Sequence, residues 1–338
     1  IRGTSSCPSV PAKSFMGGEP WTHIVLLGDS TIDNVCWTGH PHEVPEQLKG
    51  LLPDAEVTNF AADGFTSTDL LNGAVPVISW GKRREIGDPF PVCPDNVFKP
   101  LQLLRSLSPK PTHAVLSIGG NDVREILGNM RELPRIVELI QANYSKILDR
   151  ICETVSNVVL MFQYRPSFHM DGGGYGVYEA MERIPGPGDA VAKMNHLMET
   201  VYQPVLLAAR TRGLPIADLS RTFDIYDDDL YCCQIEPSAK GGALIAKLLS
   251  HVVRNHDFSG PSRLHLLRDG CLVDEANDES TPWLIPKGEG AAQAKEASLQ
   301  GQGVDTAMYR QLCAMGFEPA KAVEALQACG KDLDSAIE

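Results

Sequence analysis

Five short apolar runs, separated by longer segments with helical periodicity, constrain the fold of this chain more than any other feature. The runs are His23–Gly28, Ala55–Ala61, His113–Ser117, Asn157–Tyr164 and Pro215–Leu219. They are rich in β-branched residues, which is typical of strands buried on both faces of a parallel sheet. The clearest helical segments between and after them are Leu133–Thr154, Ala190–Thr211 and Pro237–Val253. Strands alternating with helices predict right-handed βαβ units, and therefore an α/β fold with an open, five-stranded parallel sheet covered on both faces.

The composition of the chain changes after this alternating pattern ends. We therefore expect four parts: an N-terminal extension (1–20), the α/β domain (21–255), an irregular segment with a linker (256–303) and a small three-helix domain (304–338). The irregular segment contains a predicted short hairpin at Leu264–Val273. The linker, Lys287–Gly303, is rich in Ala, Gly, Gln and Lys and is expected to be flexible.

Charge and cysteine content narrow the classes of partner. The net charge of −13 over 338 residues argues against nucleic acid or an anionic membrane as the main partner. No apolar run approaches the roughly 20 residues of a membrane span.

The nine cysteines are scattered without zinc-site spacing, and Ile1–Phe15 has no apolar leader. We expect reduced thiols, no metal and a cytoplasmic protein. No nucleotide-binding glycine motif follows a strand, so no cofactor is expected.

Small and polar residues follow the first three predicted strands, at the sheet edge where open α/β folds bind ligands. The first strand ends in Gly28-Asp29-Ser30, where a serine on a turn into a helix can expose its hydroxyl or simply cap the helix. Gly64 follows the second strand, and its N–H can approach an oxyanion or merely serve a turn. Asn121 follows the third strand and can donate to developing negative charge or cap a helix. Each signal is weak alone, but their succession at three strand ends is specific.

With these motifs in this order, residues 20–255 resemble the GDSL/SGNH hydrolase superfamily. The resemblance implies a three-layer α/β/α, flavodoxin-like fold and hydrolysis of a small-molecule ester through an acyl-enzyme. It implies that Ser30 is the nucleophile and that the Ser30 N–H, the Gly64 N–H and the Asn121 amide form the oxyanion hole. Four further residues are expected to shape the substrate site: Asp29, Asp33, Trp37 and Gly120.

The sequence departs from this family in its last block, which normally reads Asp-x-x-His. Here Cys233 stands at the Asp position and Glu236 at the His position. A free Glu is a weaker base than His by about two pKa units, or roughly 3 kcal/mol, although burial can raise its pKa. We therefore predict carboxylate-assisted serine catalysis, slow or shifted toward acid pH. The acidic loop 227–229 and four histidines are weaker candidates for assisting Ser30; the histidines are His40, His42, His169 and His196.

A second interpretation remains open at this point, in which the fold is kept but catalysis is lost with the histidine. The protein would then be a binding module. Retention of the serine, glycine and asparagine at the three strand ends favours the enzyme, and the missing histidine favours the binding module. Replacing Glu236 by Gln distinguishes the two, because only the enzyme would lose turnover.

The C-terminal residues Val304–Glu338 predict three short helices, with Pro319 in a first helical turn and Gly330 after a helix end. Met315-Gly316-Phe317 lies between the first two helices. With this loop, the segment resembles ubiquitin-associated (UBA) domains, and the resemblance implies that Met315, Gly316 and Phe317 bind ubiquitin in an intracellular setting. The alternative is a structural three-helix cap or an unrelated helical hairpin.

Overall fold

The structure is a computed structural model. It describes residues 22–170, 176–185, 187–279 and 283–285, and in the C-terminal segment residues 304–305, 308–309, 312 and 319–329. The predicted N-terminal extension, the predicted linker Lys287–Gly303 and the Met315–Phe317 loop lie outside these residues.

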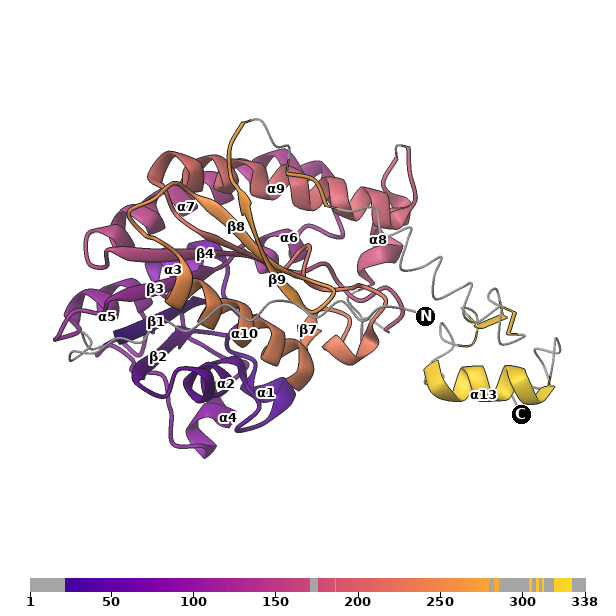
Figure 1. The fold of residues 1–338 in the computed structure, drawn as a ribbon, viewed down its shortest axis with the longest axis horizontal. Coiled ribbons are helices and arrows are strands. Elements are labelled where there is room, and N and C mark those ends of the chain that lie inside the picture. The colour runs from indigo at the N-terminus through magenta and orange to yellow at the C-terminus, as the bar shows by residue number, and fades with distance from the viewer. Residues whose placement is uncertain are drawn as a thin grey trace, which may run out of the picture.

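One seven-stranded sheet, in the order β2-β1-β3-β4-β5-β8-β9, forms the centre of the molecule (Figure 1). Its first five strands are β1 (Thr22–Gly28), β2 (Ala55–Ala61), β3 (His113–Ser117), β4 (Asn157–Phe162) and β5 (Ile216–Asp218). They pair in parallel, and all five correspond to the predicted apolar runs. The predicted α/β class with a parallel sheet is therefore confirmed.

Two further strands extend the sheet beyond the five that were predicted. Strand β8 (Arg263–Arg268) pairs in parallel with β5, and β9 (Cys271–Ala276) returns antiparallel to β8. The turn between them contains Asp269 and Gly270, both with positive φ, so the predicted hairpin is confirmed. The sheet thus continues past residue 255, the predicted end of the α/β domain.

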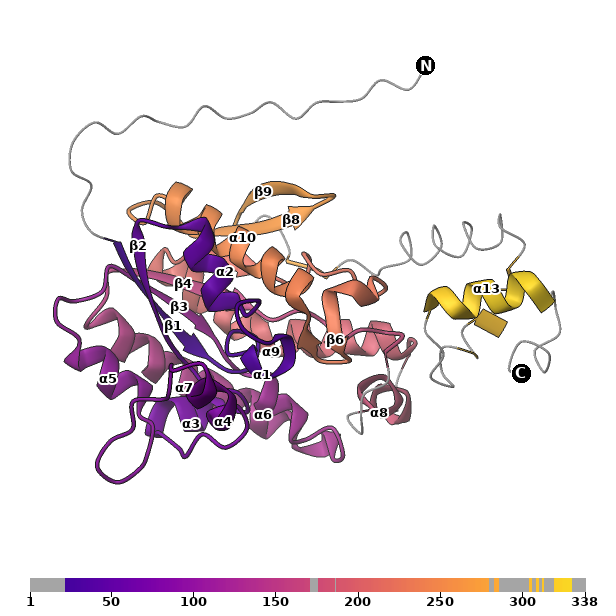
Figure 2. The same ribbon diagram turned by 90° about the horizontal axis from the view of Figure 1, so that it is seen from below.

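Helices cover both faces of the sheet, which gives three layers (Figure 2). Helices α2 (Val44–Leu51) and α10 (Ala239–Asn255) lie on one face. The other face is covered by α3 (Ser67–Asn72), α5 (Pro100–Ser106), α7 (Leu133–Cys152) and α9 (Ala190–Arg212). Alternate residues of β1 enter two separate apolar cores, because successive side chains of a strand point to opposite faces. The predicted doubly wound arrangement is thus confirmed.

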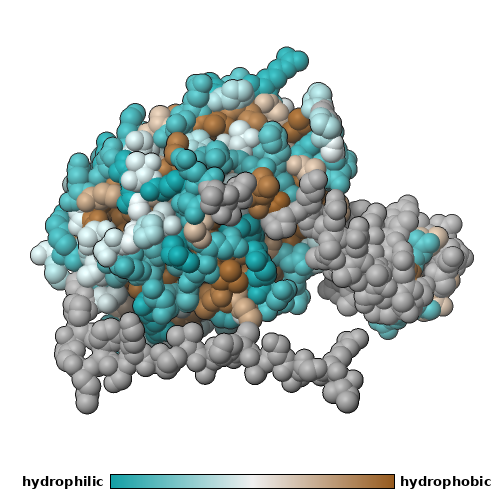
Figure 3. Space-filling model, turned by 45° about the horizontal axis from the view of Figure 1, so that its top comes forward, coloured by the Kyte–Doolittle hydropathy of each residue, from teal (hydrophilic) through white to brown (hydrophobic). Residues whose placement is uncertain are grey.

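Shorter elements lie in the connections at the sheet edge. They are α1 (Val35–Thr38), α4 (Trp80–Glu85), α6 (Gly120–Arg124), α8 (Val177–Arg183), the 3-10 turns Met130–Glu132 and Asp228–Leu230, and the small hairpin of β6 (Tyr231–Cys233) and β7 (Glu236–Pro237). None of the described helices is both long and apolar enough to span a membrane. On the face drawn in Figure 3, hydrophilic residues predominate and hydrophobic residues form small separate patches.

After the sheet, residues 283–285 pack back onto the α9 face. Trp283 is buried against Phe162, with ring centroids 5.0 Å apart, and its indole N–H donates to the Asp218 carboxylate at 2.8 Å. Beyond them, α13 (Pro319–Cys329) confirms the predicted helix that begins at Pro319.

Candidate active site

The end of strand β1 presents Ser30 at the carboxyl edge of the sheet. Gly28 has φ +151°, and a Cβ atom there would lie 2.0 Å from the Ser117 carbonyl oxygen on β3, so only glycine lets the two strand ends approach. The chain then turns sharply, and the Asp29 carboxylate accepts the Thr31 N–H at 3.1 Å. This turn fixes the direction of the Ser30 side chain.

Ser30 forms a buried hydrogen bond with the residue that replaces the expected histidine. Its Oγ donates to Glu236 Oε1 at 3.2 Å across 206 residues of sequence, and the two residues are 9% and 2% exposed. Glu236 is held in the β6–β7 hairpin directly before α10. The Ser238 hydroxyl caps α10 by accepting the Gly241 N–H at 3.1 Å. A Cβ atom at Gly241 would lie 2.2 Å from the Leu230 carbonyl oxygen, so glycine lets the first turn of α10 pack against the hairpin.

The surroundings of Glu236 favour its neutral form. Burial raises the pKa of this carboxyl well above its ordinary value, and the negative charges of Asp63 and Cys233 raise it further, whereas the Ser30 hydrogen bond lowers it. Its Oε2 atom has no hydrogen-bond partner among the described residues. Burial likewise raises the pKa of Asp63 to about 6 and that of Asp29 to about 7. Glu236 therefore releases its proton only at a pH well above that of a free glutamate.

The two predicted oxyanion residues differ in their relation to Ser30. Asn121 lies in α6 and lines the same cavity as Ser30; its Nδ2 donates to the Phe65 carbonyl oxygen at 3.0 Å. A primary amide has a second N–H, which is the one available to a ligand. Gly64 has φ +83°, and a Cβ atom there would lie 2.9 Å from Ile78 Cδ1. Gly64 is not among the residues that line the cavity.

A glutamine that was not predicted from the sequence supports the serine turn. Gln163 Nε2 donates to Asp29 Oδ2 at 2.7 Å and to Thr31 Oγ1 at 3.1 Å. A Cβ atom at Gly120 would lie 2.3 Å from Gln163 Oε1, so glycine is needed for this arrangement. Gln163 directly follows β4, but the apolar run predicted from the sequence, Asn157–Tyr164, includes it, so the sequence pattern placed it inside the strand and not at the strand end.

Two of the predicted substrate-binding residues do not line the cavity. Asp33 is 1% exposed and accepts the Asp63 N–H at 3.1 Å and an Asn59 amide N–H at 3.2 Å. It thereby ties the turn after β1 to the end of β2, a supporting position rather than one in contact with a ligand. Trp37, on α1, is partly buried and also lies outside the cavity lining. Asp29 and Gly120 do line it.

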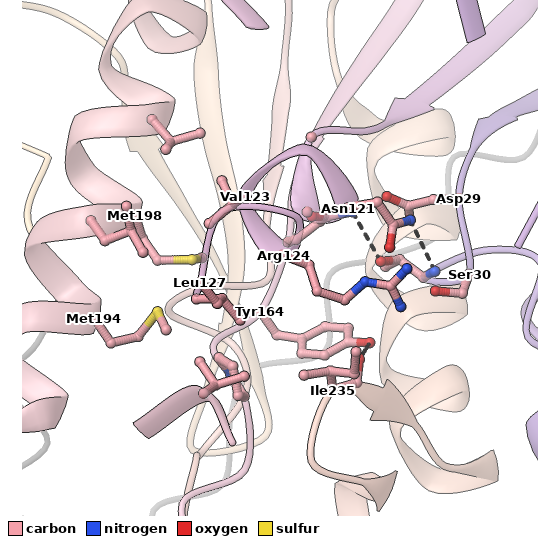
Figure 4. A pocket seen from close by; sticks show the side chains of 18 of the residues that line it. Asp29, Ser30, Asn121, Val123, Arg124, Leu127, Tyr164, Met194, Met198 and Ile235 are labelled. Carbon is pink, nitrogen blue, oxygen red and sulfur yellow. Dashed lines mark hydrogen bonds between the residues drawn. The ribbon is translucent and has the colours of Figure 1, made fainter. Parts of the chain in front are cut away.

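The cavity beside Ser30 has a volume of about 110 Å³ and is polar at one end only (Figure 4). Ser30, Asn121 and Arg124 lie together at the polar end. Met194 and Met198 point into the cavity from α9 on the opposite side. The remaining apolar lining comes from Val123, Leu127, Pro166, Val177, Leu197, Val201 and Ile235, together with the rings of Tyr164 and Tyr202. The α9 residues carried no sequence signal, because a helix face that lines a cavity has the same pattern as one that packs in a core.

No histidine of the described chain lines this cavity. His169 Nδ1 lies 3.6 Å from the Asp228 carboxylate, and His40 pairs with a glutamate of its own loop at 2.8 Å. The outer carboxylates of the acidic loop 227–229 form ion pairs with Lys240. Glu236 is therefore the titratable group that contacts Ser30 in the described structure.

The C-terminal segment has a small core of its own, formed by Val304, Tyr309, Leu312 and Leu326. The family model of the UBA/TS-N domain matches residues 304–338. This segment is therefore similar to UBA domains. The resemblance drawn from the sequence is thus confirmed, although the loop expected to bind ubiquitin lies outside the described residues. No curated protein matches the chain.

Several solved structures are similar to the α/β part. An extracellular lipase from Streptomyces rimosus is 14% identical, with a TM-score of 0.43 over 68% of this chain and 99% of the lipase. Phospholipase A1 from Streptomyces albidoflavus is also 14% identical, with a TM-score of 0.45 over 68% and 98% of the two chains. An acetylxylan esterase from Geobacillus stearothermophilus is 16% identical, with a TM-score of 0.41 over 70% and 95%.

Proposed function

We propose that the α/β domain is a serine esterase with Ser30 as nucleophile and Glu236 as general base. The carrying observation is the 3.2 Å hydrogen bond between Ser30 Oγ and Glu236 Oε1, at the polar end of an apolar cavity. A nucleophile hydrogen-bonded to a base, next to amide donors, is the arrangement that acyl transfer needs.

In the proposed reaction, ionised Glu236 accepts the Ser30 proton as Oγ attacks the ester carbonyl carbon. The second N–H of the Asn121 amide stabilises the resulting oxyanion, with the Ser30 and Gly64 N–H groups as the other proposed donors. The intermediate expels the alcohol, which takes the proton from Glu236, and an acyl-enzyme remains. Water then attacks the acyl carbon, Glu236 accepts its proton and returns it to Ser30 Oγ, and a carboxylic acid leaves.

The raised pKa of Glu236 sets the direction of the pH dependence. Only the ionised carboxylate can accept the serine proton, so the reaction should accelerate as pH rises through the raised pKa. The sequence predicted activity shifted toward acid pH. The structure supports the opposite shift, because burial and two neighbouring negative charges raise the pKa of this carboxyl.

We propose an aliphatic acyl ester as the substrate class. Methionine, leucine and valine side chains from α9 face the polar end at which the carbonyl would react. Such a wall favours a hydrocarbon chain over a polyhydroxylated group, because it offers no hydrogen bonds to hydroxyls.

Labelling with a fluorophosphonate probe from pH 5 to 9, read by intact mass, tests this function without knowledge of the natural substrate. We expect one adduct, which increases with pH and is absent in Ser30→Ala. Glu236→Gln should slow labelling at least 100-fold, as expected for loss of a general base. Ser106→Ala, at an exposed serine, is the control and should label normally. An adduct that persists in Ser30→Ala contradicts the proposal.

A non-catalytic binding protein is the alternative, and one observation favours it. Glu236 has an unpartnered Oε2 and a raised pKa, so no described group orients it as an ionised base. Absence of labelling at every pH would support this alternative.

We further propose that the UBA domain binds ubiquitin and that the protein is cytoplasmic. The family match supports the first part. The second is supported by the scattered positions of the nine cysteines, a spacing that favours reduced thiols in a reducing compartment.

A further inference from the structure

Three histidines and an aspartate gather where α10 ends against the β8–β9 hairpin, away from the Ser30 cavity. His265 and Asp274 lie directly opposite each other in the β8–β9 register, and His265 Nδ1 is 2.7 Å from Asp274 Oδ1. His251 reaches the same Oδ1 atom from α10, with its Nε2 3.2 Å away. One ligand atom from each of the three residues lies within 4.8 Å of the others.

We propose that His251 Nε2, His265 Nδ1 and the Asp274 carboxylate form a binding site for a divalent metal ion of the zinc type. Neutral imidazole nitrogens and a carboxylate oxygen are ligands that zinc prefers. In a tetrahedral zinc site with bonds of 2.0–2.2 Å, donor atoms lie about 3.3 Å apart. Asp274 Oδ1 lies 2.7 and 3.2 Å from the two imidazole nitrogens, and the three ligand atoms lie within 4.8 Å of one another, so movements of the partly exposed Asp274 and His251 side chains would bring them to this geometry.

The partial exposure of Asp274 and His251 leaves the fourth position of the metal open to water. The Asp274 side chain is 38% exposed and that of His251 is 18% exposed, whereas that of His265 is 2% exposed. His265 thus provides a fixed ligand from the sheet, and Asp274 can adjust without disturbing the core.

Outer contacts orient the histidines for this role. His265 Nε2 lies 3.2 Å from His256 Nδ1, so a proton on Nε2 can be donated to His256 while Nδ1 binds the metal. His256 Nε2 is buried with no hydrogen-bond partner among the described residues. The Arg263 guanidinium donates to the Asp274 carbonyl oxygen, and its positive charge opposes the binding of a cation at this site.

The sequence predicted no metal site because its cysteines lack the spacing of one. The present donors are separated by up to 23 residues and come from a helix and two strands. A bound ion would tie the end of α10 to the edge hairpin, so we expect it to raise the thermal stability of the whole domain.

The test is a titration of the metal-free full-length chain with Co²⁺ and then Zn²⁺, after alkylation of the thiols because exposed cysteines also bind these ions. We expect one equivalent of Co²⁺, seen by its visible absorption and displaced by Zn²⁺, and a rise in melting temperature with Zn²⁺. His251→Ala and Asp274→Asn should each weaken binding at least tenfold and abolish the rise. These partly exposed positions are chosen because replacing buried His265 risks misfolding.

His196→Ala, at an exposed histidine on α9, is the matched control and should bind as the unchanged protein does. Absence of stoichiometric binding by the alkylated chain would overturn the proposal. Binding that is unchanged in both His251→Ala and Asp274→Asn would also overturn it, and the cluster would then be a hydrogen-bonded group only.

Discussion

Burial raises the pKa of Glu236, so the ionised form that the proposed catalysis needs is disfavoured in the folded protein. Ionisation of this carboxyl therefore lowers the stability of the fold. The residue is 2% exposed, and its Oε2 atom has no partner among the described residues. In the folded protein the proton is held more tightly than at the ordinary value of 4.5. Its contribution to stability is therefore fully present below that pH and is lost as pH rises through the raised pKa.

We predict that Glu236→Gln stabilises the protein at alkaline pH while it removes serine reactivity. Glutamine has the shape of the protonated carboxyl and never ionises. Each pH unit between the two pKa values of the glutamate costs about 1.4 kcal/mol. Urea unfolding at pH 8 should show a higher free energy of unfolding than in the unchanged protein, with little difference at pH 4.5.

Glu138→Gln is the matched control, since Glu138 is exposed on α7. It should change the unfolding free energy by the same small amount at both pH values. An equal stability of Glu236→Gln and the unchanged protein at pH 8 would mean that Glu236 is not strained when ionised, and the predicted pH dependence of labelling would fail with it.

The residues of the candidate site differ in how far the sequence could predict them. Ser30 and Asn121 follow apolar runs, so their position at one sheet edge follows from topology alone, and Glu236 was found from its place in the last family block. Gln163 also follows a strand but belongs to none of the family motifs. Asp33 was expected at the substrate, but a sequence does not distinguish a buried aspartate that supports a loop from one that faces a ligand.

At the scale of elements, the close contact of β1 and β3 depends on Gly28. An alanine Cβ there would lie 2.0 Å from the Ser117 carbonyl oxygen, at a φ of +151°. We predict that Gly28→Ala lowers the unfolding free energy by about 3 kcal/mol or more, because the backbone must shift to relieve the overlap. Chemical denaturation measures this loss.

Gly50→Ala is the matched control for the glycine prediction. Gly50 lies in α2, and a Cβ atom at this position would have no neighbour within 4 Å. There alanine should stabilise by up to about 1 kcal/mol, because it favours the helix. Equal effects at the two positions would show that the β1–β3 contact does not require glycine.

Helix α9 provides the apolar wall opposite Ser30, and its side chains should set the length of the acyl group. We predict that Met198→Trp, which fills the cavity, lowers kcat/KM for a p-nitrophenyl octanoate at least tenfold relative to the acetate, or about 1.4 kcal/mol. Leu207→Trp is the control, because Leu207 lies on the same helix but is 55% exposed. A parallel loss on both esters would indicate general damage rather than a shorter acyl site.

The strands show why part of the fold was missed. The first five were predicted because each is a continuous apolar run. Strand β8 has an arginine at each end and a histidine within it, so it is not a continuous apolar run, and the sequence indicated its local hairpin but not its parallel pairing with β5. The pairing follows the same strand–helix–strand order as the other parallel pairs, but it could not be predicted because β8 was not recognised as a buried strand.

At the scale of the whole molecule, the α/β domain and the UBA-like C-terminal segment have separate apolar cores. Trp283 anchors the chain to the α/β core at its last described point before the linker. We therefore expect the reactivity of Ser30 and the binding of ubiquitin to be independent properties that one chain combines.

The double variant Met315→Ala/Phe317→Ala tests this independence. We predict that it weakens ubiquitin binding at least tenfold, or about 1.4 kcal/mol, because it removes the apolar side chains of the loop expected to contact ubiquitin. NMR of labelled ubiquitin mixed with the full-length chain measures the affinity. Glu324→Gln, at an exposed position of α13, is the control and should bind normally. Labelling of Ser30 should be unchanged in both variants; a change in labelling with ubiquitin bound would instead show that the two domains are coupled.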